Sequence, residues 1–419
     1  MKIVFCSKFY FLNGGTERYI SELMPQLSSM GHTPIPFSVR YAGNWKSPYN
    51  QYFLSPPGPA DQARFETIRL TPMSLIRHLD RSVYSFEARS YLSRLLDETG
   101  GADIAYLLNI YNYMSPSIIH TFRQRGIPIA LQLGDYHLLC PAYLFLRDGR
   151  PCTLCIGGAY RHGLRHRCIK HSYPASAVRV LSMYIQKWLK LYHLVDAFIV
   201  PCRFMESKLV EGGFPADRMH LLHYPVSAPP REPADRRGDY ILFFGRVSYE
   251  KGLDTLIQAY QQISPDVDLV LIGKDYDGEK ERLQRFILPE YTRRIQFLGF
   301  KDGQELSRWI AGALFAVVPS RWYDNAPISI YESYSHETPV VAANLGGIPE
   351  QVEQGVTGRL FSPDSVDELR EALLWMLSDR ERLRQMGKAG KDFVARWCSL
   401  EGHAGRLLEI FERLRSRSY

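Results

Sequence analysis

Long hydrophobic runs are missing from this sequence. Among its 419 residues there is no stretch of about 18 consecutive apolar residues, the length that a membrane-spanning helix needs. The first apolar run, Ile3–Cys6, is too short for the core of a secretion signal. We therefore expect a cytoplasmic protein that does not span a membrane.

Signatures of several enzyme classes are absent as well. There is no phosphate loop ending in Gly-Lys-Ser, no HExxH helix and no nucleophile elbow. The segments 266–268 and 275–277 fit the Asp-x-Asp pattern of metal-dependent transferases, but that pattern is frequent by chance and both flank loops. No recognised nucleic-acid-binding module occurs either. The sequence thus predicts no cofactor for catalysis and no nucleic-acid partner.

Cysteine is scarce, and an odd number of seven in a chain without an export signal argues against a disulfide framework. Four of the seven fall close together around a CxxC spacing, and four thiolates can hold a tetrahedral zinc ion. Two hypotheses stay open, a structural zinc site and a set of reduced thiols. The four residues are Cys140, Cys152, Cys155 and Cys168.

Positive charge is concentrated in one stretch. The net charge of the chain is +7. Residues 147–193 contain nine cations and one acid, Asp148, so their net charge of +8 exceeds that of the whole chain. Their cations are Arg147, Arg150, Arg161, Arg165, Arg167, Lys170, Arg179, Lys187 and Lys190.

Within this stretch, residues 176–196 combine cations with apolar residues at helical spacing. One hypothesis is a basic amphipathic helix on an anionic membrane surface, at the inner face of the cell membrane. The other is a core helix whose cations reach solvent along their apolar stems. The expected apolar positions are Val180, Met183, Tyr184, Trp188 and Leu191.

Short apolar runs alternate with helical patterns along the whole chain, which is typical of parallel sheets with crossover helices. A helix over 16–30, capped by Thr16, follows the first run, and further helices are expected over 253–263 and from about residue 327. The pattern predicts an α/β fold of two doubly wound, Rossmann-like domains that face a cleft. The expected strands are 2–6, 104–108, 127–133 and 197–201, then 240–244, 268–272, 294–298, 314–318 and 339–342.

A segment rich in proline and charge marks the boundary between the domains. It predicts an N-terminal domain over 1–225 with a cysteine-rich basic insert at about 140–196. A linker over 226–238 and a second domain over 239–395 follow. The last segment, 396–419, is expected to be a helix that packs back on the N-terminal domain.

Candidate ligand-binding residues follow two strands of the second half. Gly245 and Arg246 come directly after the strand 240–244, and Lys251 follows five residues later. Ligands of doubly wound sheets bind beyond the carboxyl ends of the strands. A guanidinium fork and an ammonium group at such an end suit a diphosphate without a metal ion, although each cation alone is also typical of a solvated surface.

The segment after strand 314–318 has acids at Asp324 and Glu332. Asp324 or Asn325 is expected to cap a helix with Pro327 in its first turn, which would leave backbone amides free for an anion. The two carboxylates can accept hydrogen bonds from the hydroxyls of a ribose and a hexose. The alternatives are a plain helix cap and a solvated helix face.

The second half resembles glycosyltransferase family 4, the retaining enzymes of the GT-B fold. The resemblance rests on the ordered motifs FFGRVSYEKG, VLIGK, IQFLGF, VPSRWYDNAPISIYES, TPVVAANLGGIPE and GVTGRLF. It implies that Arg246 and Lys251 bind the diphosphate and that Glu332 binds the ribose. It also implies that Asp324, where the family usually has glutamate, contacts the transferred sugar. The backbone near Phe300 would lie against the base, and the turn at Gly346 and Gly347 would lie near the phosphates and the sugar.

The first half resembles the same family less completely. Its turn over 13–17 resembles the family's N-terminal signature, which implies that Gly14 and Gly15 approach the donor phosphate. The segment LQLGDYHLLCP resembles the family's His-Asp segment, with Gly134 at the histidine position. Asp135 is retained, and His137 is the candidate imidazole.

Together with the candidate residues, the resemblance implies a metal-independent, retaining hexosyltransferase. Its donor would be a UDP- or GDP-linked sugar and its acceptor a glycan or a lipid-linked acceptor, in surface polysaccharide biosynthesis. The domain over 1–225 would bind the acceptor, and the domain over 239–395 would bind the nucleotide sugar. Two alternatives stay open, a sugar-nucleotide epimerase of the same fold and a non-catalytic protein that binds sugar nucleotides.

Overall fold

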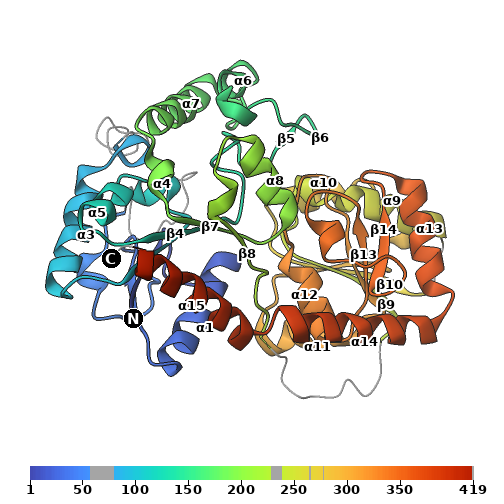
Figure 1. The fold of residues 1–419 in the computed structure, drawn as a ribbon. Helices are drawn as coiled ribbons and strands as arrows, with labels where there is room; N and C mark the ends of the chain where they lie inside the picture. Colours follow the sequence, from blue (N-terminus) through green and yellow to red (C-terminus); the bar gives the residue numbers. More distant parts are fainter. Residues whose placement is uncertain (57–79, 228–237, 264–265, 277, 418–419) are drawn as a thin grey trace. The chain divides into compact units, whose positions relative to one another are not determined.

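The computed structural model describes residues 1–56, 80–227, 238–263, 266–276 and 278–417 (Figure 1). The chain forms two compact units. The first consists of Met1–Leu144, Thr153–Leu222 and Leu400–Tyr419, and the second of Phe145–Cys152 and His223–Ser399. Most of the expected linker over 226–238 lies outside the described residues.

The first unit contains a six-stranded sheet in which every pairing is parallel, in the order β2-β1-β3-β4-β7-β8. The central strands are buried on both faces, as their continuous apolar runs predict. The strands are β1 (Lys2–Ser7), β2 (Thr33–Phe37), β3 (Ile104–Leu108), β4 (Ile129–Gln132), β7 (Ala197–Val200) and β8 (Met219–Leu221).

Helices join these strands. The main ones are α1 (Gly15–Ser29), α3 (Phe86–Glu98), α4 (Tyr111–Met114), α5 (Ile118–Gln124), α6 (Arg161–Arg165), α7 (Tyr173–Trp188), α8 (Arg203–Glu211) and α15 (Leu400–Arg417). Short 3-10 helices are η1 (Asn50–Tyr52), η3 (Ile156–Gly158), η4 (Leu191–Leu194) and η5 (Ala216–Arg218).

Two helix boundaries differ from those expected. Gly14, not Thr16, occupies the N-cap of α1, and the Thr16 hydroxyl instead accepts a hydrogen bond from the Asn109 side chain at 2.9 Å. The basic helix ends at Trp188 rather than continuing to residue 196, because the backbone turns into the left-handed region at Lys190.

The last helix of the chain, α15, belongs to the first unit and lies beside α1 (Figure 1). A buried chain of hydrogen bonds links the two helices to the sheet. The Tyr19 hydroxyl bonds His403 Nε2 at 2.8 Å and the Tyr106 hydroxyl at 2.8 Å, and Tyr106 donates to Gln132 at 2.9 Å. Phe411 is fully buried against Tyr106, with ring centroids 5.3 Å apart. The end of the chain is therefore part of the first unit's core.

The second unit has a parallel six-stranded sheet in the order β11-β10-β9-β12-β13-β14. Counted along the unit, this order is 3-2-1-4-5-6, the one typical of dinucleotide-binding Rossmann domains. The strands are β9 (Tyr240–Phe244), β10 (Asp268–Ile272), β11 (Ile295–Gly299), β12 (Phe315–Val318), β13 (Val340–Ala343) and β14 (Gly358–Phe361).

Its helices are α9 (Leu253–Ile263), α10 (Glu279–Gln284), α11 (Gly303–Gly312), α12 (Ile328–Ser335), α13 (Val366–Leu377) and α14 (Arg380–Trp397), with the 3-10 helices η6 (Tyr249–Lys251), η7 (Pro289–Tyr291) and η8 (Ile348–Glu350). A short hairpin of β5 (Leu146–Arg147) and β6 (Arg150–Pro151) belongs to this unit as well, although the sequence suggested one insert in the first. The segment expected to form one terminal helix from residue 396 is also divided, since α14 continues to Trp397 and α15 begins at Leu400.

In the two six-stranded sheets, three strands were not predicted, and all three lie at sheet edges: β2, β8 and β14. The hairpin strands β5 and β6 were not predicted either. β2 contains Pro34 and Pro36, residues that a central strand does not tolerate because each removes a backbone donor from the ladder. Within the described part of the chain, no helix has the length and apolar character needed to cross a membrane.

Replacing Phe411 with alanine should lower the free energy of unfolding by about 3–5 kcal/mol, because it removes a fully buried aromatic ring. Chemical denaturation measures this change. Phe86→Ala is the matched control, since Phe86 is 71% exposed and its loss should cost well under about 1 kcal/mol. Equal losses in the two variants would mean that α15 does not contribute to the core.

Candidate functional site

The winding of the second sheet reverses between β9 and β12, which are neighbours although two strands separate them in the chain. Ligands of such sheets bind in the crevice outside the strand ends at this reversal. Gly245, Arg246 and Lys251 follow β9, and the segment 319–325 follows β12. The candidate donor-binding residues of the second unit thus lie at the place that the fold favours for a ligand.

Two glycines bring neighbouring loops close together. Gly252 has φ of 67°, and a Cβ there would lie 2.1 Å from the carbonyl oxygen of Pro319. Gly346 has φ of 65°, and a Cβ there would lie 2.5 Å from the carbonyl oxygen of Asp324. The amide of Gly347 donates to that same oxygen at 2.8 Å. The loops after β9, β12 and β13 can meet only because glycine occupies these positions.

An ion pair lies between these loops. Lys251 Nζ donates to Asp324 Oδ2 at 2.5 Å, and the two side chains are 15% and 5% exposed. Ser320 donates to the same carboxylate oxygen at 3.0 Å, and the Lys251 ammonium lies 5.6 Å from the centre of the Trp322 ring. The sequence associated Lys251 and Asp324 with the same ligand, and the structure brings them into direct contact.

Arg246 is more exposed. Its guanidinium pairs with Glu250 at 3.1 Å, lies over the Tyr276 ring and is 42% exposed. An ion pair of this exposure contributes little to stability, so the Arg246 side chain is available to a ligand at small cost.

The remaining candidates of the second unit lie before α12, within α12 and after β11. Asn325 is buried, and its side-chain oxygen accepts from the Ala326 amide at 2.7 Å. Neither Asp324 nor Asn325 caps α12, because the helix begins later and has Pro327 at its N-cap without a side-chain hydrogen bond. Glu332 lies in the middle of α12 and is partly exposed, and Phe300 follows β11 and is 63% exposed.

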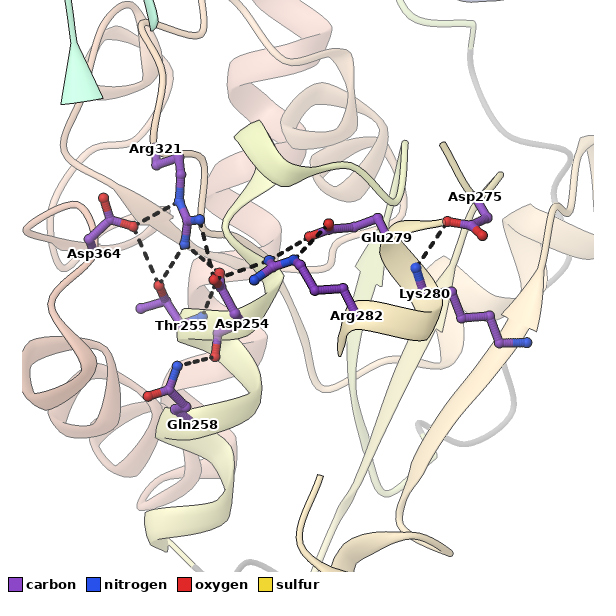
Figure 2. A network of polar contacts seen from close by, with 9 residues as sticks. All are labelled: Asp254, Thr255, Gln258, Asp275, Glu279, Lys280, Arg282, Arg321 and Asp364. Atoms are coloured by element: carbon purple, nitrogen blue, oxygen red, sulfur yellow. Dashed lines mark hydrogen bonds and ion pairs between the residues drawn. The ribbon is translucent and has the colours of Figure 1, made fainter. Parts of the chain in front are cut away.

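A polar network supports the loop that carries Lys251 (Figure 2). Arg321 donates to both carboxylate oxygens of Asp254 and, at 2.9 Å, to Asp364. Its guanidinium lies 4.5 Å from the centre of the Tyr249 ring, and its backbone amide donates to the Glu250 carbonyl. Arg321 therefore ties η6, the first turn of α9 and the loop after β14 to the segment that contains Asp324.

Two residues of this network lie in or next to motifs that the sequence already showed, but the sequence did not predict their contact. Arg321 lies inside the motif that carries Asp324, and Asp254 follows Lys251 by three residues. Burial raises the pKa of Asp254, but the hydrogen bonds from Arg321 and Arg282 outweigh burial and hold that pKa below its ordinary value. The carboxylate is thus ionised at neutral pH, when it binds the guanidinium most strongly.

Arg321→Ala should lower the free energy of unfolding by about 3 kcal/mol at pH 7, because the mostly buried carboxylate of Asp254 loses its main partner. The depressed pKa of Asp254 in the folded state means that its contribution is present above about pH 4 and is lost as the pH falls further. The difference between wild type and variant should therefore shrink in that range.

Denaturation curves at pH 7, 5 and 3 measure this difference. Arg285→Ala is the matched control, because Arg285 is 77% exposed and its removal should change stability by less than about 0.5 kcal/mol. A pH-independent difference between Arg321→Ala and wild type would contradict the role given to Asp254.

In the first unit, the glycine turn also follows a strand end at a reversal of winding, since β1 lies between β2 and β3. Gly14 and Gly15 begin α1, and the Asn109 bond to Thr16 links this turn to the end of β3. The neighbouring Glu17 is buried, which raises the pKa of its carboxyl group, while Lys8 opposes that rise.

Asp135 and His137 form a pair after β4. The carboxylate and His137 Nδ1 are 2.5 Å apart, and the side chains are 19% and 13% exposed. The imidazole is stacked between the rings of Tyr111 and Tyr143, at centroid distances of 4.3 and 4.8 Å. The sequence gave no signal for this aromatic sandwich.

The surroundings of this pair set its protonation. Burial lowers the pKa of His137, and the Asp135 carboxylate counteracts that effect only in part. The carboxyl of Asp135 would have a raised pKa through burial, but His137 lowers it. A neutral imidazole that donates Nδ1–H to an ionised carboxylate leaves Nε2 as a hydrogen-bond acceptor. The buried Arg179 also supports this loop, since it donates to the His137 carbonyl at 2.8 Å.

The four clustered cysteines are the candidate ligands of the predicted zinc site. Among the residues that the structure describes, no group of three or more His, Cys, Asp or Glu side chains is arranged to hold a metal ion. Cys152 belongs to the second unit, and Cys140, Cys155 and Cys168 belong to the first. The zinc site stays a prediction.

Solved structures have the same architecture as this chain. Sucrose-phosphate synthase from Thermosynechococcus elongatus matches with a TM-score of 0.70 and 17% identity, over 99% of both chains. HepE from Anabaena, solved with UDP and glucose, matches with a TM-score of 0.66 and 16% identity, over 98% of this chain and 99% of that one. At these identities the likeness shows the fold, which is GT-B: two Rossmann-like α/β units with parallel sheets.

The family follows from the sequence models. Residues 14–225 match the glycosyl transferase 4-like domain, and residues 228–393 match the glycosyl transferases group 1 domain. The chain therefore belongs to the group 1 glycosyltransferases of the family 4 type.

Curated relatives agree with this assignment. An uncharacterized glycosyltransferase of Methanocaldococcus jannaschii is 30% identical over 221 residues, which cover 52% of this chain and 60% of the relative. The GDP-mannose-dependent monoacylated alpha-(1-6)-phosphatidylinositol monomannoside mannosyltransferase of Corynebacterium glutamicum is 30% identical over 176 residues, 40% of this chain and 45% of the relative. The match thus spans about half the length of these relatives.

Proposed function

We propose that this protein transfers a hexose-type sugar from a UDP- or GDP-linked donor to a glycan or lipid-linked acceptor, with retention at the anomeric carbon. The reaction would take place in the cytoplasm and would serve the biosynthesis of a surface polysaccharide. The observation that supports it most is the pair of cations, Arg246 and Lys251, after the strand of the second unit where the winding reverses.

The donor would bind the second unit through its diphosphate. Two fixed cations supply positive charge where the leaving group develops negative charge, which is the stabilisation that a metal ion gives in other transferases. The relatives agree with this donor class, because HepE was solved with UDP and the mannosyltransferase uses GDP-mannose. We propose that no metal ion takes part in the transfer.

Donor binding would change the partner of Lys251, which pairs with Asp324 in the structure. A bound diphosphate would compete with Asp324 for the Lys251 ammonium, which now donates to that carboxylate at 2.5 Å. Asp324 would then be free to accept hydrogen bonds from the hydroxyls of the transferred sugar. Glu332 would hold the ribose, Phe300 the base, and the turn at Gly346 and Gly347 the sugar and phosphates.

The first unit would supply acceptor binding and the glycine turn at Gly14 and Gly15. His137 is proposed to bind a sugar hydroxyl through Nε2, because Nδ1 is engaged by Asp135. The stacking between two tyrosine rings fixes the plane of the imidazole and hence the direction in which Nε2 accepts.

Release of nucleotide diphosphate from UDP- and GDP-sugars tests the proposed activity. We expect release that is rapid only when an acceptor is present, with the sugar recovered on the acceptor, and that is unchanged by a chelator. Release that needs no acceptor and yields an epimerised sugar would indicate the epimerase alternative. Donor binding without any turnover across a panel of glycan and lipid-linked acceptors would indicate a binding protein.

Arg246→Ala and Lys251→Ala should each lower kcat by about 100- to 1000-fold, because each removes one stabilising cation from the leaving group. Arg246 is 42% exposed, so its variant should keep the wild-type melting temperature. Lys251→Ala leaves the buried Asp324 carboxylate without its ammonium partner. The melting temperatures of Lys251→Ala and of its double variant with Asp324→Asn therefore measure any folding defect. Lys388→Ala, a change at an exposed residue of α14, is the control and should retain full activity. Wild-type turnover in either single variant would refute the role of that residue.

A further inference from the structure

A row of large apolar side chains runs along the exposed side of α7. Their spacing of eight, three and four residues places them on one face of the helix. Ala177, which is partly exposed, lies in the first interval. The exposed fractions are 57% for Tyr173, 55% for Leu181, 38% for Tyr184 and 80% for Trp188.

This row differs from the apolar face that the sequence suggested. Val180, Met183 and Leu191 are buried and pack inside the first unit, while Tyr184 and Trp188 point to the other side. The helix therefore has two apolar faces. The inner face packs in the core of the unit, whereas the side chains of the outer row are exposed to solvent.

Cations flank the outer row. The α6 helix lies beside α7 (Figure 1), and the backbone amide of Arg161 donates to the Tyr184 hydroxyl at 3.1 Å. The guanidinium of Arg167 lies 5.4 Å from the centre of the Tyr173 ring. No aspartate or glutamate occurs between Gly149 and Val195. The exposed cations of α6, α7 and their connections are Arg161, Arg165, Arg167, Lys170, Lys187 and Lys190.

We propose that this surface, the outer row of α7 with its flanking cations, docks the first unit on an anionic lipid bilayer. Tryptophan and tyrosine are suited to the boundary between headgroups and acyl chains, and a helix lying in that plane inserts its apolar residues while its cations meet anionic headgroups. Residues 149–195, which include this whole surface, contain no acid that would repel those headgroups.

A second copy of this chain is a poorer occupant. In a twofold interface the same patch faces itself, so the six cations of one copy would approach the six of the other without any acid between them. A bilayer rich in anionic lipid complements that charge instead. Docking would bring the acceptor-binding unit to the surface where a lipid-linked acceptor is presented.

The proposal does not depend on the transfer reaction, because docking can be measured without donor or acceptor. Flotation of the full-length protein with vesicles of phosphatidylcholine and phosphatidylglycerol should recover most of it at low salt and much less at about 0.5 M salt. Vesicles of phosphatidylcholine alone should recover little. Absence of flotation with anionic vesicles at low salt would overturn the proposal.

Two variants test the row and the cations separately. Leu181→Ser with Trp188→Ser should reduce the bound fraction at limiting lipid by about 10-fold, because both side chains insert. Arg165→Gln with Lys170→Gln and Lys190→Gln should give a similar loss at low salt and remove most of the salt dependence. All changed residues are exposed, so the melting temperature should stay at the wild-type value.

Matched controls carry the same changes in the second unit. Leu374→Ser with Trp397→Ser replaces side chains that are 47% and 46% exposed, and Arg285→Gln with Lys388→Gln and Arg396→Gln removes the same charge. Both controls should float like wild type. Undiminished flotation of Leu181→Ser with Trp188→Ser would contradict the proposed surface, as would a wild-type dimer in solution that this variant converts to a monomer.

Discussion

The ammonium group of Lys251 and the carboxylate of Asp324 are in contact where the strands of the second unit end, and both side chains are mostly buried. The contact requires the loops after β9 and β12 to approach closely, which the left-handed glycine at 252 permits. It also requires those loops to stay in place, which the Arg321 network ensures. The rest of the candidate donor site is arranged around this pair.

Three cations at this edge of the sheet each have an acidic partner in the structure. Lys251 pairs with Asp324, Arg246 with Glu250, and Arg321 with Asp254. The pairs differ in burial, and this difference indicates different roles. The Arg321 pair is enclosed and tied to several segments, which suits a structural function. The Arg246 pair is partly open to solvent, so an incoming anion can displace its acid at little cost.

The first unit also has a polar pair after the end of a strand, but other contacts hold that pair in place. Its core includes α15, the helix from the far end of the chain. His403 of that helix is hydrogen-bonded to Tyr19 of α1. The polar pair of the unit, Asp135 and His137, is oriented by aromatic stacking rather than by an ion network. The exposed row on α7 lies in the same unit, so acceptor binding and surface docking are proposed for one part of the chain.

The sequence by itself determined the central strands, the ends at which glycines, cations and acids occur, and the family. Runs of apolar residues and turn residues act locally, so their pattern can be seen along the chain. It did not predict the edge strands β2, β8 and β14, because short edge strands have weak apolar patterns and β2 contains two prolines.

Only the tertiary structure decided which side of α7 is buried, that Arg321 binds Asp254 and Asp364, and that His137 is stacked between two tyrosines. Helical spacing marks positions that share a face, but a helix with two apolar faces does not reveal which one meets the core. Partners that are tens of residues apart in the chain meet through the packing of strand ends, and no local pattern encodes that meeting.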